Sequence, residues 1–227
     1  MSELVPVLLR FALYLDLMLV FGLGLFGLYA DSRLLNLKPL LRRLAALGLL
    51  LSLASLLSMT QTMSGAEDWP TLWMHLQMML WQTELGWMWW LRIAALVLVA
   101  FSTRLATVFG GVALVTLAWV GHGVMHEGSL GQWHLLSDSA HLLAAAGWVG
   151  ALAAFGLMLA SASEQAVQVL AHALAGFERV GVVFVAVLIG TGVANYLFVV
   201  GPNLDGITGG VYAILLCLKL GVFGLML

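Results

Sequence analysis

The stretch that decides the fold is residues 5–30, which read VPVLLRFALYLDLMLVFGLGLFGLYA. Its only charged side chains are Arg10 and Asp16. A helix needs roughly 20 mostly apolar residues to cross a bilayer, and this run exceeds that length. It is also too long for the core of a signal peptide, and no small-residue cleavage site follows it. We therefore expect a retained first transmembrane helix.

The rest of the chain has a similar composition. Of its 227 residues, 63% are apolar and 9% are charged, and the mean hydropathy is +1.06. Soluble domains carry about 25% charged residues, so the outer surface of this protein must face hydrocarbon. Because lipid excludes open strand edges, we expect an all-α polytopic bundle that forms a single transmembrane domain over residues 1–227. The lone cysteine, Cys217, excludes an internal disulfide and a cysteine-based metal site.

Seven segments are apolar and long enough to span a membrane. They are residues 5–30, 40–63, 86–103, 105–124, 138–161, 173–200 and 210–227. Residues 64–84 are expected to form only a connection between the second and third spans. The last span reaches Leu227 without a polar flank. Since a natural protein rarely stops inside the bilayer, we expect an eighth helix beyond the sequence shown.

Basic residues set the orientation of these spans, because cytoplasmic loops are enriched in Lys and Arg. They gather at the first connection and mark the third, as Arg33, Lys38, Arg42, Arg43 and Arg104. The second, fourth and sixth connections carry acidic residues and no Lys or Arg. Most tryptophans fall at the predicted outer ends, as an aromatic belt would. The pattern predicts a multi-pass protein of the bacterial inner membrane with a periplasmic N-terminus.

Histidines concentrate between the fourth and fifth spans. The segment Gly121-His122-Gly123-Val124-Met125-His126-Glu127 holds two of the six, four residues apart, so a helix would put both rings on one face. His134, Asp138 and His141 have the spacing i, i+4 and i+7, which also places them on one helix face. Consecutive spans joined by a short loop are antiparallel neighbours. We therefore expect the two polar faces to meet at the outer end of the bundle.

Such a meeting would gather imidazole, carboxylate and thioether groups in one pocket, which is typical of metal or haem sites. The candidate ligands are His122, Met125, His126, Glu127, His134, Asp138 and His141. The spacing does not choose between copper and haem b, for which His122 and His141 would be the axial pair. A histidine at a membrane interface can also be a simple end group, and this alternative applies most to His126 and His134.

A second group of candidate ligands lies in the outer connection, at Met74, His75, Met78 and Met79. Met74 and Met78 form one i, i+4 pair, and His75 and Met79 form another. Thioether sulfur is a soft ligand that suits Cu(I), and imidazole binds copper in either oxidation state. The alternative is that these methionines only fill gaps in the packing.

Four charged residues fall inside or near the ends of spans: Arg10, Asp16, Arg92 and Lys219. Each is costly in hydrocarbon without a partner. Asp16 and Lys219 lie well inside their spans. We therefore expect an interhelical ion pair between them, with a place on a polar transport route as the alternative.

These motifs resemble those of the CopD (PcoD) family of copper-resistance inner-membrane proteins. The most specific element is residues 141–152, HLLAAAGWVGAL, which resembles the family's His-Leu-x-Ala-Ala-x-x-Trp-x-Gly-Gly-Leu element. Gly121-His122-Gly123 resembles its Gly-His-Ala element. Further segments that match in style are residues 10–22, Phe177 with residues 190–195, and residues 218–220.

The resemblance implies an eight-helix protein that receives periplasmic copper from a soluble carrier of the CopC type and moves it inward. Carried over by position, the matching residues are His122, Glu127, His134 and His141. It also implies that residues 170–227 begin the C-terminal helical region of the family. The chain departs from the family at Tyr14, near which many members carry a histidine, and at Ala151, which is often glycine.

Three functions stay open on the sequence. The first, which we favour, is copper binding and transfer without enzymatic activity, with the lipid bilayer and a CopC-type carrier as partners and no nucleic acid. The second is electron transfer through haem b, as in a haem-dependent cupric reductase. The third is a scaffold without a cofactor. The sequence contains neither a phosphate-binding loop nor a nucleotide domain, which excludes ATP-driven pumping by this chain alone.

Overall fold

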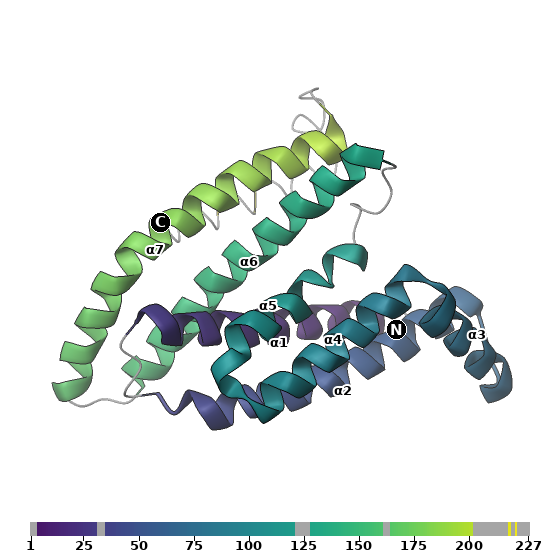
Figure 1. Ribbon diagram of the computed structural model, residues 1–227, viewed down its shortest axis with the longest axis horizontal. Helices are drawn as coiled ribbons and strands as arrows, with labels where there is room; N and C mark the ends of the chain where they lie inside the picture. Colours follow the sequence, from purple (N-terminus) through teal and green to yellow (C-terminus); the bar gives the residue numbers. More distant parts are fainter. Residues whose placement is uncertain are drawn as a thin grey trace.

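The computed structural model describes residues 4–30, 35–120, 128–160 and 164–201, together with Leu218 and Gly221. Within these residues the protein is helical and contains no strand (Figure 1). The elements are α1 (Leu4–Tyr29), α2 (Leu37–Ser64), α3 (Trp69–Gln82), α4 (Glu84–Phe101), η1 (Thr103–Leu105), α5 (Ala106–Val115), η2 (Ala118–Val120), α6 (Gly128–Leu159) and α7 (Glu164–Val200).

Six segments of the described chain are long and apolar enough to cross a membrane. They are Leu4–Tyr29, Leu37–Ser64, Glu84–Phe101, Thr103–Val120, Gly128–Leu159 and Gln168–Val199. The prediction of an all-α, multi-pass membrane protein is therefore confirmed. The predicted seventh span, residues 210–227, lies outside the described residues except for Leu218 and Gly221, so the seven-span count and the eighth helix stay predictions.

Helix α1, purple in Figure 1, lies at the centre of the bundle and packs against α2, α5 and α6. Its inward face is apolar, and Leu17, Val20 and Phe26 have no solvent exposure. Gly22 of α1 meets Gly150 of α6 so closely that a Cβ atom on Gly22 would lie 2.7 Å from the Gly150 Cα atom. Small residues at such a crossing let two transmembrane backbones approach each other.

The bundle has two ends that differ in charge. At one, which we call the η1 end, α1 finishes near the start of α5 and of α7, as the contacts of Gly24 with Ala106 and of Gly176 with Tyr29 show. At the other, the α3 end, lie α3 and the starts of α1, α4 and α6. Lys38, Arg42, Arg43 and Arg104 belong to the η1 end, whereas Glu67, Asp68 and Glu84 belong to the α3 end.

Residues 64–84 are not only a connection, because they contain helix α3. The Asp68 carboxylate accepts a hydrogen bond of 3.0 Å from the Thr71 amide, and Pro70 occupies the first turn, so both start signals of a helix are present. Its 14 residues extend over only about 21 Å, too short to cross a bilayer. Leu76 and Met79 pack against Leu56 of α2 and hold α3 across the end of the bundle.

A single side chain joins α3 to α4. The Thr83 hydroxyl donates a hydrogen bond of 2.6 Å to the Met79 carbonyl in the last turn of α3. The same oxygen accepts a hydrogen bond of 3.1 Å from the Gly86 amide in the first turn of α4. Thr83 is therefore the C-cap of one helix and the N-cap of the next.

One predicted span boundary is wrong, because the fifth span begins at Gly128 and not near residue 138. The sixth span begins at Gln168, within several residues of the predicted start near 173, and helix α7 itself begins earlier, at Glu164. Both helices continue through polar residues that hydropathy assigns to connections. The predicted fourth span is divided, since α5 ends at Val115 and the short η2 follows it.

Candidate functional site

The first part of α6 carries a row of polar side chains at the α3 end. His134 is 1% exposed, and its Nε2 atom lies 3.7 Å from Asp138 Oδ2, one helical turn away. The His134 ring stacks on Phe198 of α7, with the ring centroids 5.0 Å apart and the planes inclined by 23°. The α6–α7 contact therefore fixes the orientation of this imidazole.

His141 lies two turns further along the same helix and also faces α7. Its Nδ1 atom is 2.8 Å from Thr191 Oγ1. The Thr191 hydroxyl donates its own hydrogen to the Val187 carbonyl, at 2.6 Å, so the oxygen must accept from the imidazole. The network thereby assigns the neutral ring a hydrogen on Nδ1 and a lone pair on Nε2, an arrangement suited to metal binding.

The other ligands predicted near this row cannot be placed. His122, Met125, His126, Glu127 and Lys219 lie outside the described residues. In the part of the chain that the structure describes, no three His, Cys, Asp or Glu side chains come close enough to hold a metal ion. His134, Asp138 and His141 would therefore need ligands from elsewhere, and only His141 of the predicted haem pair is described.

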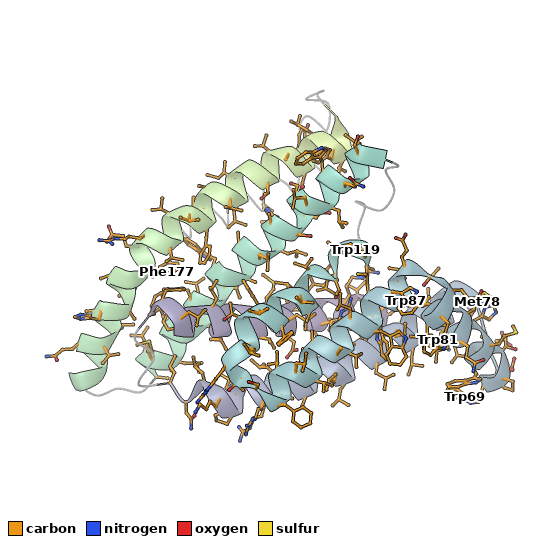
Figure 2. The ribbon with its side chains drawn as sticks, in the orientation of Figure 1. Trp69, Met78, Trp81, Trp87, Trp119 and Phe177 are labelled. Atoms are coloured by element: carbon orange, nitrogen blue, oxygen red, sulfur yellow. The ribbon has the colours of Figure 1, made fainter. Side chains whose placement is uncertain are left out.

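The candidate ligands of α3 do not share one face. Met74 and Met78 are 54% and 46% exposed, whereas Met79 is buried against α2, with its sulfur 3.4 Å from Thr60 Oγ1. His75 is half-buried. Figure 2 shows Met78 at the same end of the molecule as Trp69, Trp81 and Trp87, the region predicted to be an aromatic belt. The outward-facing pair is thus Met74 and Met78 alone.

A cavity of about 260 Å³ lies between α1, α2, α3, α4 and η2 at the α3 end. Its lining includes Arg10, Tyr14 and Arg92, together with hydroxyl groups of α2 and the inward-facing Met79. Arg92 is 5% exposed, and its Nε atom donates a hydrogen bond of 2.8 Å to Thr116 Oγ1. Two of the four predicted intramembrane charges therefore line one cavity.

Asp16, a third predicted intramembrane charge, is 3% exposed and lies between α1, α2 and α4. A Cβ atom on Gly48 would stand 2.6 Å from its Oδ2 atom, so a larger residue at position 48 would require the carboxyl to move. Within the described residues neither carboxyl oxygen has a hydrogen-bond partner. Its pairing with Lys219 stays a prediction, because Lys219 lies outside the described residues.

Sequence reasoning missed the residues that support these groups. Thr191, which orients His141, lies between Gly190 and Gly192 in an apolar helix, and a hydroxyl flanked by two glycines was a usable signal. Thr116, which binds Arg92, carried no comparable signal. Tyr14, which also lines the cavity, donates a hydrogen bond of 3.5 Å to the Leu117 carbonyl.

Comparison with known proteins gives three related findings. The family described as Copper resistance protein D-like, N-terminal domain, matches residues 1–132. The chain is 47% identical over 247 aligned residues to Copper resistance protein D of Pseudomonas syringae pv. tomato, which covers 100% of this chain and 80% of that protein. It is 30% identical over 215 residues to Inner membrane protein YebZ of Escherichia coli (strain K12), covering 85% and 71% respectively. No solved structure matches the chain.

Proposed function

Because this chain belongs to the copper resistance protein D family, we propose that it binds copper at the α3 end through histidine and methionine side chains and moves the ion across the membrane. The bacterial inner membrane is the proposed location. The α3 end is its periplasmic face in this proposal, since the basic residues Lys38, Arg42 and Arg104 belong to the η1 end. The N-terminus is then periplasmic.

The observation that carries the proposal is the polar row on α6. His134 and His141 present two imidazoles on one helix, with Asp138 between them, and Thr191 orients the His141 ring so that its lone pair is on Nε2. In sequence, His122, Met125, His126 and Glu127 immediately precede this helix. Imidazole and thioether together suit copper in its reduced state, and imidazole alone suits both states.

Transfer begins, in this proposal, with a soluble periplasmic carrier of the CopC type that delivers the ion to the α3 end. Met74 and Met78 are exposed at that end and would meet the ion first. The imidazoles of α6 would then receive it. Asp16, in the interior between α1, α2 and α4, supplies a carboxyl further along the membrane for the inward route.

The test compares His134→Ala and His141→Ala with His172→Ala in the purified full chain. His172 is exposed near the start of α7, at the η1 end, and serves as the matched control. Copper content and affinity would be measured by metal analysis and competition titration, and a visible spectrum of the same sample would reveal haem. We expect a loss of about tenfold or more in copper affinity for the two α6 variants and none for the control.

Uptake would be measured in liposomes that contain a copper probe and the protein in one orientation. We expect uptake above that of empty liposomes, and a reduced rate for His141→Ala. Equal copper binding by all three histidine variants would refute the proposed ligands. A Soret band in protein made with adequate haem supply would instead indicate the haem-dependent alternative.

A further inference from the structure

The cavity at the α3 end holds positive charge without a negative partner. Arg92 is buried in it, and Thr116 holds the guanidinium at Nε. Arg10, which is exposed on α1, contributes a second guanidinium, and among the described residues no acidic side chain lines the cavity. Among the described residues no carboxylate forms an ion pair with either arginine. A buried guanidinium is costly in a membrane protein unless its N–H groups are paired, so the cavity is suited to an anion.

Two hydroxyl groups in the same wall also lack partners. Ser52 has no solvent exposure and Ser55 is half-buried, and within the described residues neither Oγ atom has a hydrogen-bond partner. A serine in a helix commonly bonds back to the carbonyl one turn earlier, which these two do not. Buried hydroxyls are normally satisfied. Both line the cavity and can donate to a bound group.

The remaining wall is mostly apolar. Leu9, Leu13, Leu56 and Leu117 line it beside the polar groups. On the outer face of α1, Leu8 and Phe11 flank Arg10 and are 61% and 65% exposed, as lipid-facing residues are. The site therefore combines anion-binding groups with an apolar surface, about two helical turns inside the starts of α1 and α4.

We propose that this cavity binds one anionic phospholipid, with its phosphate on Arg92 and Arg10 and the first part of an acyl chain along the leucines. The guanidinium fork matches phosphate oxygens in pairs. Ser52 and Ser55 donate to the head group. The same two arginines disfavour a cation beside Met59, Met63 and Met79, which also line the cavity. The inference does not depend on the proposed copper function.

The test uses the delipidated full chain in detergent. Phosphatidylglycerol or phosphatidylethanolamine with identical acyl chains would be titrated in, and bound lipid counted by native mass spectrometry. Arg10→Gln removes an exposed cation with little risk to folding, and Ser55→Leu fills the cavity. Arg179→Gln, an exposed arginine of α7, is the matched control. Inorganic phosphate would be added as a competitor in a separate series.

We expect one tightly held phosphatidylglycerol per chain and about tenfold weaker retention of phosphatidylethanolamine. Arg10→Gln and Ser55→Leu should each weaken phosphatidylglycerol about tenfold, the effect of one charge-assisted hydrogen bond or more, while Arg179→Gln leaves it unchanged. Equal retention of both lipids, or unchanged retention in both cavity variants, would overturn the proposal. So would full displacement by millimolar phosphate, which would identify a free anion as the ligand. Copper affinity, measured on the same samples, should not change in Arg10→Gln.

Discussion

The crossing at Gly22 and Gly150 allows a sharp test of how α1, which lines the cavity, packs against α6, which carries the polar row. In Gly22→Ala the new methyl carbon would lie 2.7 Å from the Gly150 Cα atom and 3.0 Å from its nitrogen. Ordinary carbon contacts are 3.5–4.0 Å, so the helices must separate by at least about 1 Å. Because these two atoms and the Ala146 carbonyl oxygen, which is nearer still, all belong to the backbone, no side-chain rotation can relieve the contact.

We expect a packing cost of roughly 1–3 kcal/mol, partly offset by the gain of about 0.5–1 kcal/mol that alanine brings to a helix. Gly156→Ala is the matched control, since a Cβ atom at this exposed position of α6 would meet nothing within 4 Å. It should be neutral or stabilising. The difference between the two variants isolates the packing cost.

The assay is thermal unfolding of the purified chain in one detergent, followed by tryptophan fluorescence, with denaturant unfolding to place the difference on an energy scale. Equal unfolding midpoints for Gly22→Ala and Gly156→Ala would refute the close crossing.

Three further predictions concern single side chains. Thr116→Val removes the acceptor of Arg92 Nε and should lower the unfolding free energy by roughly 1–3 kcal/mol, whereas Thr116→Ser should keep it, as thermal unfolding would show. Thr191→Val removes the hydroxyl that orients His141, and we expect copper affinity to fall about 10- to 100-fold in competition titrations without loss of the fold. The hydrogen bond from the Thr71 amide lowers the pKa of the Asp68 carboxyl below its ordinary value. The ionised cap therefore stabilises α3 fully at a pH above the ordinary pKa, and this stabilisation is lost as the pH falls through the lowered pKa. The protection factor of the amides at the start of α3, which is the intrinsic exchange rate at each pH divided by the observed rate, should therefore fall in acid, and Asp68→Asn should remove this dependence.

The membrane spans followed from the sequence because lipid imposes a length rule that apolar runs satisfy directly. Helix α3 did not, since a short amphipathic helix at a membrane surface has no such rule. Its start signals were nevertheless present, as Asp68 precedes Trp69 and Pro70 and marks an N-cap followed by a first turn. The helix starts at Gly128 and Glu164 were missed because a helix can extend beyond the apolar segment that crosses the membrane.

The candidate site could likewise be predicted only in part. The spacing of His134, Asp138 and His141 placed them on one helix face, because that depends only on helical periodicity. Their partners Phe198 and Thr191 depend on which helix packs against α6, and helical periodicity carries no such information. Arg10 and Arg92 line one cavity because of how α1 and α4 are arranged, and helical periodicity does not predict this arrangement either.

Thr83 gives the corner between α3 and α4 an unusual mechanical property. Because one hydroxyl oxygen is hydrogen-bonded to both helices, rotation of either helix relative to Thr83 would break one of these two bonds. A push on the exposed surface of α3 would therefore be transmitted to α4, the helix that carries Arg92, and not absorbed at the joint. A protein that binds at Met74 or Met78 would therefore act on α4 as well, and α4 extends into the membrane interior.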